Sequence, residues 1–493
     1  MSSPGARGEI RKSPTGVPGL DEITHGGLPT GRPTLICGGP GSGKTLLGIT
    51  FLVNGALRFD EPGVLMTFEE NAEELAEDVA SLGFDLAALV AEGKLVVDYV
   101  HLDRSEIEET GEYDLDGLFV RLDYAVRTVG AKRVVLDTIE SLFGGLQNES
   151  ILRAELRRLF RWLRDRDLTV VITGERGETA LTRHGLEEYV TDAVIALDHR
   201  VQDQISTRRI RVVKYRGSLH GTNEYPFLID AEGVSVLPVT SLTLAHEAPT
   251  DRVSSGLAEL DGMLDGKGFY RGSTVLIAGT AGTGKTTLAA HFADAACRRN
   301  ERCLYFLFEE SPAQMMRNMR SAGIELEPWV AAGRLRFHAD RPSSYGLETH
   351  LVQMHRLVES FAPDVVVIDP MTNLLSVGTQ LDVRAMLTRL IDYLKTRQIT
   401  GLFTSLTAGG ADLESTEALI SSLMDTWMVA ATEEVERRRR RWLTVLKSRG
   451  MAHSDETREF RLTGRGITIL PATTGGSEAA LSGRPAPSAR PAP

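Results

Sequence analysis

Short apolar runs alternate with stretches of helical period along the whole chain. The runs in the first half are residues 33–38, 63–68, 94–100, 133–138, 168–174 and 209–215, and those in the second half are residues 273–279, 303–308, 334–339, 364–370, 399–405 and 442–447. Such runs are typical of buried strands, and helices between them are typical of parallel sheets. The pattern predicts an α/β fold built on mainly parallel central sheets.

The second half of the chain repeats the first half. The segment TGVPGLDEITHGGLPTGRPTLICGGPGSGKTLL, which starts at Thr15, is echoed by SSGLAELDGMLDGKGFYRGSTVLIAGTAGTGKTTL, which starts at Ser254. Later landmarks recur in the same order but with shorter spacing in the second half, so we expect a short insertion in the first copy around residues 101–117. A duplicated domain explains this pattern, whereas a coincidental pair of domains does not.

Length and local composition set the expected domain boundaries. A chain of 493 residues is too long for one ordinary core, because domains rarely pass ~250 to 300 residues. A segment without periodicity separates the halves, and the chain ends in a stretch rich in Pro, Gly, Ser and Ala that cannot bury a core. We expect a flexible N-terminus at 1–12, a first domain at 13–238, a linker at 239–251, a second domain at 252–471 and a disordered tail at 472–493.

Composition excludes several classes of protein. The chain has 55 Lys and Arg against 67 Asp and Glu, a formal net charge of −12, which speaks against a generally basic nucleic-acid coat. Cys37, Cys297 and Cys303 have no disulfide or metal-ligand spacing, so we expect reduced thiols in a cytoplasmic protein. No stretch approaches the ~18 to 20 uninterrupted apolar residues of a membrane span, and the N-terminus has no apolar export signal. We expect no membrane partner.

Two glycine-rich loops carry the clearest chemistry. The segments GGPGSGKT at 38–45 and GTAGTGKT at 279–286 both match the P-loop pattern, directly after a predicted strand and before a predicted helix. In such a loop the backbone N–H groups and the lysine bind the nucleotide phosphates, and the following threonine holds Mg²⁺. A chance glycine-rich turn is the weaker alternative for two matches in register. The predicted nucleotide contacts are Gly38, Gly41, Ser42, Gly43, Lys44 and Thr45 in the first copy and Gly279, Gly282, Thr283, Gly284, Lys285, Thr286 and Thr287 in the second.

Acidic residues end the neighbouring strands. Asp137 and Asp369 each close an apolar run, as the second half of a Mg²⁺-nucleotide site requires, although a carboxylate that caps a helix is the simpler alternative. The pairs Glu69–Glu70 and Glu309–Glu310 stand at the tips of two other strands, where one carboxylate can orient and deprotonate a nucleophile. The alternative is a charged start of the next helix. The candidate Mg²⁺ ligands are Thr45, Asp137, Thr286, Glu309 and Asp369.

A basic signature recurs late in each half. Lys214 and Arg216, like Lys447 and Arg449, belong to the pattern K-x-R-G-x-x-H, and residues two apart on a strand share a face. Paired cations suit the charge of a transferring phosphoryl group, whereas a solvated edge strand is the alternative. The basic run 437–441 could be a nucleic-acid patch, but its acidic surroundings favour an exposed hairpin or a subunit surface.

These motifs together resemble the KaiC family of double-domain RecA-like ATPases, over about residues 13 to 471. The resemblance implies two tandem RecA-like P-loop NTPase domains with mainly parallel central sheets. It also implies a two-tiered homohexamer with ATP between subunits, slow hydrolysis in the first tier, and autophosphorylation with its reversal in the second. ATP and Mg²⁺ are the implied cofactors, and a two-component or Kai-type regulator is a possible partner.

The resemblance also implies roles for single residues. Glu69 and Glu70 match the pair associated with hydrolysis, and Glu309, with Glu310 beside it, matches the base that activates the acceptor hydroxyl. Ser421 and Ser422 match the phosphorylated pair. The remaining matches are Ser81, a first-domain nucleotide contact, Thr416, a further threonine position of the family, and the residues that reach the neighbour's ATP, namely Lys214, Arg216, Ser218, His220, Arg441, Lys447 and Arg449.

The acceptor position differs between the halves and from the family. Ser421 and Ser422 stand opposite Glu188 and Tyr189 in the first copy, so only the second half offers adjacent hydroxyls there. The family has Thr where this chain has Ser422. It also has a Trp beside the second nucleotide where this chain has Ala322, and its longer C-terminal segment does not resemble the tail of this chain.

Two other functions compete with an ATP-hydrolysing autokinase. A RecA-like core can also serve a DNA-dependent ATPase, because fold does not settle function. The net charge of −12 and the absence of an evident basic domain make nucleic acid an unfavoured partner. A nucleotide-gated scaffold without kinase activity is the other alternative. Stimulation of ATP hydrolysis by DNA would indicate the first, and ATP-dependent assembly without phosphoserine the second.

Overall fold

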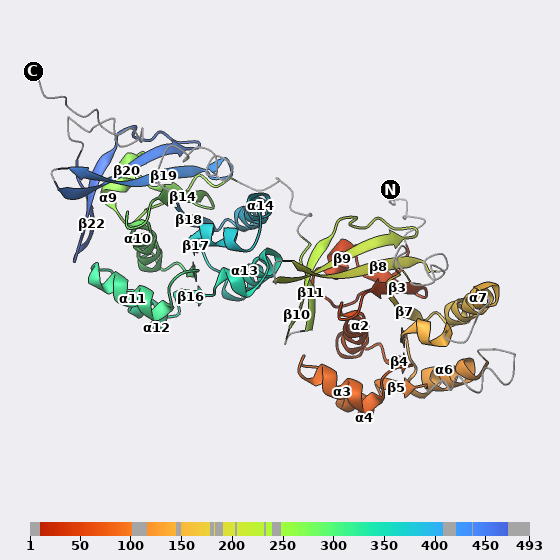
Figure 1. Ribbon diagram of the computed structural model, residues 1–493. Helices are drawn as coiled ribbons and strands as arrows, with labels where there is room; N and C mark the ends of the chain where they lie inside the picture. The colour runs from red at the N-terminus through yellow and green to blue at the C-terminus, as the bar shows by residue number, and fades with distance from the viewer. Residues whose placement is uncertain are drawn as a thin grey trace, which may run out of the picture. The chain divides into compact units, whose positions relative to one another are not determined.

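The computed structural model describes residues 10–100, 116–143, 149–177, 182, 191–202, 205–230, 233–238, 248–407, 421–435 and 437–471. The chain divides into two compact units, residues 1–241 and 242–493, and each unit has its own sheet (Figure 1). The expected tail and most of the expected N-terminal segment, insertion and linker lie outside the described residues.

The first unit is an α/β domain. Its strands are β1 (Lys12–Ser13), β2 (Leu28–Pro29), β3 (Pro33–Gly38), β4 (Gly63–Thr67), β5 (Leu95–Tyr99), β6 (Arg133–Asp137), β7 (Thr169–Glu175), β8 (Ala193–Gln202), β9 (Ile205–Tyr215), β10 (Tyr225–Asp230) and β11 (Gly233–Val236). Its helices are α1 (Leu20–Ile23), α2 (Lys44–Arg58), α3 (Ala72–Ala80), α4 (Leu86–Ala91), α6 (Asp116–Val129), the 3₁₀ helix η1 (Ile139–Phe143) and α7 (Glu149–Asp165). Among the described residues the main sheet has nine strands in the order β11-β10-β9-β8-β3-β7-β6-β4-β5.

The second unit repeats this architecture. Its strands are β12 (Arg252–Val253), β13 (Phe269–Tyr270), β14 (Thr274–Gly279), β15 (Cys303–Leu307), β16 (Leu335–Ala339), β17 (Val365–Asp369), β18 (Thr400–Leu406), β19 (Thr426–Val435), β20 (Arg438–Ser448), β21 (Arg458–Thr463) and β22 (Gly466–Ile469). Its helices are α9 (Ala258–Met263), α10 (Lys285–Arg298), α11 (Pro312–Ser321), α12 (Glu327–Ala331), η2 (Pro342–Ser344), α13 (Leu347–Phe361), η3 (Met371–Ser376) and α14 (Gln380–Thr396). The sheet order over the described part is β16-β15-β17-β18-β14-β19-β20-β21-β22.

The predicted fold class is confirmed. In each sheet the strands from the P-loop strand outward are parallel, and β8 and β19 add a further parallel strand on its other side. The remaining strands extend each sheet antiparallel through the long hairpins β8–β9 and β19–β20. The apolar runs marked the P-loop strands, the parallel strands on one side of them, and parts of β9 and β20, but they missed β8, β19 and the last two strands of each sheet.

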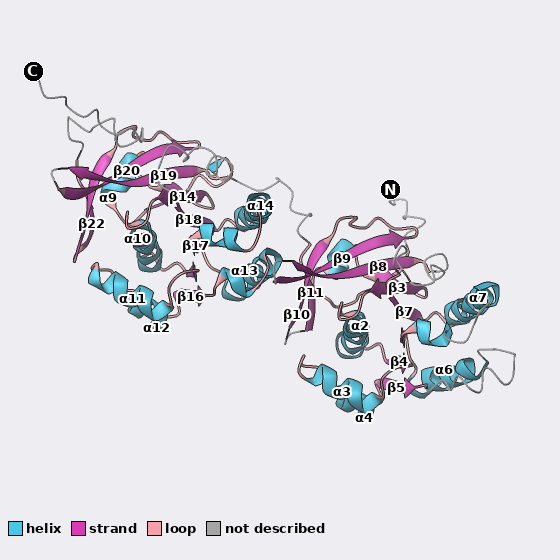
Figure 2. Ribbon diagram, viewed as in Figure 1, coloured by secondary structure: helices cyan, strands magenta, loops and turns pink. Residues whose placement is uncertain are grey.

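Alternating side chains on each parallel strand feed two apolar layers, with helices on both faces of the sheet (Figure 2). On β3 of the first unit, Ile36 packs in the cluster that contains α2, whereas Leu35 and Cys37 pack in the cluster that contains α6 and α7. Both faces are buried because a parallel sheet needs helices on each side. Within the described ranges, no helix is both long and apolar enough to span a membrane.

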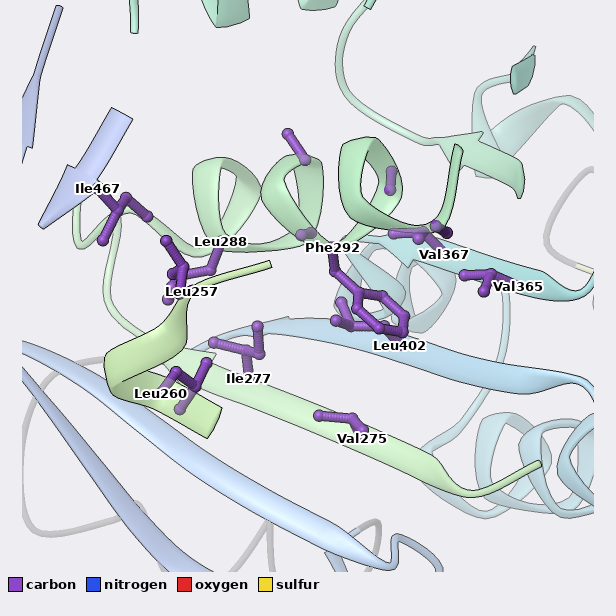
Figure 3. Close-up of a cluster of buried hydrophobic side chains, with 14 of the residues drawn as sticks. Leu257, Leu260, Val275, Ile277, Leu288, Phe292, Val365, Val367, Leu402 and Ile467 are labelled. Carbon is purple, nitrogen blue, oxygen red and sulfur yellow. The ribbon is translucent and has the colours of Figure 1, made fainter. Parts of the chain in front are cut away.

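The P-loop helix α10 covers the middle of the second sheet (Figure 3). Phe292 points from this helix toward the strands and meets Phe269 edge to face, with ring centroids 5.6 Å apart. Ile277 from β14 and Leu402 from β18 belong to the same buried cluster. This packing holds α10 against the sheet and positions the start of the helix at the P-loop.

The first unit has a buried arginine where the second unit has a valine. Arg133 begins β6 and is 0% exposed, and the equivalent first residue of β17 is Val365. Its guanidinium donates to Glu61 Oε2 at 2.6 Å, to the Phe51 carbonyl at 2.8 Å and to the Pro14 carbonyl at 2.9 Å. One cation therefore ties together the N-terminal segment, α2 and the loop before β4.

Replacing this cation should destabilise the first unit. We expect Arg133→Ala to cost about 3 kcal/mol or more in the free energy of unfolding, because it leaves buried acceptors without their donor. Urea unfolding of the full chain measures the loss. The control is Arg127→Ala, since Arg127 is 76% exposed in its ion pair with Asp123 and should contribute about 0.5 kcal/mol or less. Equal stability of the two variants would contradict the interpretation.

Candidate nucleotide-binding sites

The first P-loop joins the end of β3 to the start of α2. Gly41 and Gly43 have φ angles of 67° and 97°, a conformation that glycine adopts without strain. A Cβ atom on Gly38 would lie 2.4 Å from Ser42 Oγ and 2.8 Å from the Leu197 carbonyl oxygen, so there is no space for a side chain there. The glycines predicted from the motif are therefore the ones that let the loop wrap tightly before the helix.

The second P-loop has the same geometry. Gly282 and Gly284 have φ angles of 76° and 99°, and a Cβ on Gly279 would lie 2.1 Å from the Ala430 carbonyl oxygen. In both loops a glycine occupies the N-cap position and no side chain caps the helix. The first helical N–H groups thus have no side-chain acceptor at the cap, which suits an anion such as a phosphate.

Each P-loop lysine lies against its own loop. Lys44 Nζ donates to the carbonyls of Gly38 at 2.9 Å and Gly39 at 3.1 Å. Lys285 Nζ donates to the carbonyls of Gly279 and Thr280 at 2.8 and 2.9 Å. Both lysines are 8% exposed. In each loop the lysine ammonium is held beside the N-terminus of the following helix. The ammonium and the positive end of that helix together form a cationic site of the kind that phosphates require.

A buried carboxylate accompanies each P-loop. Asp137 and Asp369 are 6% and 5% exposed. Burial raises the pKa of both carboxyls, and hydrogen bonds from neighbouring hydroxyls, including those of Thr45 and Thr286, lower it. Each strand-end aspartate therefore lies beside the threonine that follows the P-loop lysine.

The donor atoms at these two places fit Mg²⁺. A hydroxyl and one carboxylate supply hard oxygen ligands, and Mg²⁺ completes its shell with waters and phosphate oxygens. Over the described ranges, no group of three or more His, Cys, Asp or Glu side chains forms a self-sufficient metal site. Thr45 with Asp137, and Thr286 with Asp369, would hold Mg²⁺ together with a nucleotide.

Hydroxyls from neighbouring strands hold the two carboxylates, and the sequence analysis missed them. Thr173 of β7 donates to Asp137 Oδ1, and Thr404 of β18 donates to Asp369 Oδ1. In the second unit Tyr305 of β15 also donates to Asp369 Oδ2, at 2.8 Å. A threonine at the same place in both copies of an apolar strand is a signal that could have revealed the first two. A tyrosine in an apolar strand carries no comparable signal.

The first glutamate of each pair is anchored to the loop that follows the aspartate strand. Glu69 Oε1 accepts hydrogen bonds from the hydroxyls of Thr138 at 2.8 Å and Ser141 at 3.0 Å. Glu309 Oε1 accepts one from Asn373 Nδ2 at 3.2 Å. Both glutamates are exposed. They stand at the strand tips with oxygens that face solvent, where a nucleophile can reach them.

The second glutamate of each pair meets a different neighbour in the two units. Burial raises the pKa of Glu70, and the negative charges of Asp78 and Asp137 raise it further. In the second unit Glu310 Oε2 instead accepts a hydrogen bond at 3.1 Å from Asn318, which stands on α11 where Asp78 stands on α3. The same pair of acids is therefore electrostatically more crowded in the first unit.

The late basic signatures lie against the backbone of their own unit. Lys447 Nζ donates to the Ser421 carbonyl and Arg449 Nη2 to the Ser422 carbonyl, both at 2.7 Å. In the first unit Lys214 Nζ donates to the Thr191 carbonyl at 2.7 Å. Arg449 lies just past the end of β20, yet it faces the same short segment as Lys447. The second unit therefore brings its cation pair directly to the two candidate acceptor serines.

Those serines differ in exposure. Ser421 is 5% exposed and Ser422 is exposed. Thr416 and the first-copy counterparts Glu188 and Tyr189 lie outside the described residues.

The other predicted nucleotide contacts lie on β20, after α3 and after β9. Arg441 Nε donates to the Gly282 carbonyl at 3.3 Å, so within the chain this arginine meets the P-loop of its own unit. Ser81 ends α3 and is exposed. Ser218 donates to the Leu219 carbonyl at 2.9 Å, and His220 stacks on Tyr215 with centroids 6.2 Å apart.

A parallel sheet that carries a P-loop and a strand-end carboxylate, present twice in one chain, defines a tandem RecA-like ATPase. The chain belongs to the KaiC family: the family model described as "ATPase: KaiC" matches residues 13–241 and 253–474. The resemblance seen in the sequence motifs is thereby confirmed.

Curated relatives cover most of the chain. The circadian clock protein KaiC2 of Synechocystis sp. is 55% identical over 466 residues, which span 94% of this chain and 82% of the relative. The circadian clock oscillator protein KaiC of Synechococcus elongatus is 37% identical over 475 residues, 95% of this chain and 91% of the relative. The circadian clock protein KaiC3 of Synechocystis sp. is 37% identical over 467 residues, 93% of this chain and 92% of the relative.

Proposed function

We propose that this KaiC-family ATPase uses Mg²⁺-ATP at both P-loops and phosphorylates its own serines in the second unit. Ser421 and Ser422 are the acceptors. The observation that carries the proposal is the contact of Lys447 and Arg449 with the carbonyls of these serines. The two cations that the family resemblance assigns to phosphate binding thus contact the segment that carries the two adjacent hydroxyls. The sequence offers adjacent hydroxyls at this position only in the second half.

The proposed transfer uses groups that the site supplies. Lys285 and the start of α10 bind the ATP phosphates, while Glu309 takes the proton from the serine hydroxyl. Serine Oγ then forms a bond to the γ-phosphorus as the bond from that phosphorus to the ADP oxygen breaks. Bound Mg²⁺, held by Thr286 and Asp369 with Glu309 as a further candidate ligand, would neutralise charge on the phosphates.

In the first unit the corresponding nucleophile is water. Glu69 and Glu70 stand at the end of β4 beside the first P-loop, and the sequence places no adjacent hydroxyls opposite the acceptor serines. Hydrolysis to ADP and phosphate is therefore the reaction proposed for this site.

Assembly and signalling are proposed from the relatives. We infer a homohexamer with ATP between subunits, in which Lys214, Arg216, Ser218, His220, Arg441, Lys447 and Arg449 serve the neighbour's nucleotide. The names of the relatives refer to the circadian clock, which supports a timing or signalling role and a Kai-type or two-component regulator as partner.

The contacts of the basic hairpin favour this function over DNA-stimulated ATP hydrolysis. In the register of β19 and β20, Arg439 and Arg440 stand directly opposite Glu434 and Glu433. Arg440 also lies 3.6 Å from Glu459. Acids thus face the basic run and reduce the field that would attract a nucleic-acid backbone.

The two P-loops should not be equivalent. Lys285→Ala should abolish phosphoserine while leaving much of the ATP hydrolysis, whereas Lys44→Ala should chiefly impair assembly and basal hydrolysis, because only the second unit has the acceptor serines. Phosphopeptide mass spectrometry after incubation with Mg-ATP, together with phosphate release, measures both. Equal phosphorylation of wild type and Lys285→Ala would contradict this division.

Glu309 should act as the base for transfer. Glu309→Gln keeps the size of the side chain and its place beside Asn373 but removes its basicity, which typically costs on the order of 10²- to 10⁴-fold in rate. The initial rate of phosphoserine formation is the measurement. Glu69→Gln is the matched control in the first unit and should slow hydrolysis without a comparable loss of phosphoserine. A wild-type rate of autophosphorylation in Glu309→Gln would refute the role.

If Lys447 and Arg449 act on the ATP of the neighbouring subunit, two chains that are each defective in autophosphorylation should complement each other. A mixture of Lys285→Ala and Arg449→Ala chains forms some interfaces with an intact P-loop and an intact cation pair, so phosphorylation should partly recover. ATP should also promote assembly, since a ligand of the assembled state stabilises that state. No recovery in oligomers shown to have exchanged subunits would count against a shared site.

A further inference from the structure

The two Mg²⁺-binding aspartates differ in the number of strands that hold them. Asp369 Oδ1 accepts from Thr404 of β18, and Asp369 Oδ2 accepts from the Tyr305 hydroxyl of β15 at 2.8 Å. The Thr286 side chain of the P-loop helix contributes a further hydrogen bond. Each carboxylate oxygen of Asp369 therefore accepts a hydrogen bond from a different neighbouring strand.

The first unit has a leucine at the position equivalent to Tyr305. Register with the aspartate strand places Tyr305 opposite Val367 on β17 and Leu65 opposite Val135 on β6, two residues before the aspartate in each case. Leu65 is buried and cannot donate a hydrogen bond. Asp137 still receives the Thr173 and Thr45 bonds. The two sites thus share the threonine donors and differ in this one hydroxyl.

Tyr305 is also held in place by its surroundings. Its side chain is 0% exposed, and its ring lies 5.6 Å from that of Phe337 on β16. A buried hydroxyl on a packed ring has little freedom to leave its acceptor. The hydrogen bond to Asp369 is therefore a fixed part of the second site.

We infer that Tyr305 is a positioning residue that orients Asp369 for Mg²⁺ and makes the second nucleotide site differ from the first in its dependence on the metal. The inference rests on the proposed binding of Mg²⁺-ATP at the second P-loop. A carboxylate held through both oxygens presents its remaining lone pairs in one direction. Partners of this kind behind a metal ligand typically contribute 10- to 100-fold to metal affinity or activity.

The test compares nucleotide affinity with and without metal. In the full chain, binding of a fluorescent non-hydrolysable ATP analogue is measured in saturating Mg²⁺ and in EDTA. The signal of the Lys285→Ala chain, which lacks the second P-loop lysine, is subtracted to isolate the second site. The dissociation constant in EDTA divided by the dissociation constant in Mg²⁺ reports the metal-dependent part of the affinity. For Tyr305→Phe this ratio should fall about 10-fold, while the constant in EDTA stays the same, because Tyr305 contacts the carboxylate and not the loop.

Matched variants separate positioning from packing. Tyr393→Phe also removes a buried hydroxyl from the second unit, one that lies 3.5 Å from the His355 carbonyl, and should leave the ratio unchanged. Tyr305→Leu installs the residue of the first unit and should lower the ratio as Tyr305→Phe does. It keeps the test open if the phenylalanine variant folds poorly.

Each outcome bears on a separate claim. An unchanged ratio in folded Tyr305→Phe overturns the inference and leaves the proposed function intact. Equal weakening with and without Mg²⁺, or loss of the fold in both Tyr305 variants, makes the tyrosine a packing residue and also overturns the inference. A second site that binds the analogue equally well in Mg²⁺ and EDTA in the parent chain contradicts the proposed function itself.

Discussion

A buried carboxylate at the end of a parallel strand is the constraint around which each unit is organised. A charge with almost no solvent exposure is costly unless hydrogen bonds and an opposite charge accompany it. Asp137 and Asp369 obtain their donors from threonines on the adjacent strand and on the P-loop helix, and the P-loop lysine supplies the opposite charge. Strand order, helix start and loop conformation must all be correct for these groups to meet. The fold and the site are therefore specified by the same contacts.

Comparison of equivalent residues in the two units shows which substitutions affect stability and which affect the chemistry of the site. Arg133 in place of Val365 serves stability, since its donors hold the backbone carbonyls of Phe51 and Pro14. Asp78 in place of Asn318 puts a negative charge near the strand-tip Glu70, and this charge adds to the effect of burial in raising the pKa of Glu70. That effect gives the first unit a more basic glutamate, which remains ionised only at a higher pH than an unperturbed one.

In each sheet the sequence predicted the P-loop strand and the strands on one side of it better than the strands on its other side. The runs at 33–38 and 133–138 became β3 and β6 because strands buried on both faces are apolar throughout. The whole of β8 was missed, and its outer half carries polar residues that face partners across the hairpin: Asp198 stands opposite Arg209. Among the site residues, the P-loops were readable from local spacing. Tyr305 was not, because its role depends on an aspartate that the sheet brings to it from a distant part of the chain.

The contacts of Lys447 and Arg449 have a thermodynamic consequence. An ammonium or guanidinium group that donates to the carbonyl of Ser421 or Ser422 has fewer hydrogens left for any phosphate that approaches. If Lys447 and Arg449 bind phosphate as proposed, a phosphate that draws them away breaks their hydrogen bonds to the serine carbonyls. By reciprocity, any change that tightens the segment around the cations must weaken phosphate binding by the same factor. Under that proposal, phosphate occupancy at Lys447 and Arg449 and the hydrogen bonds of these cations to residues 421 and 422 change together.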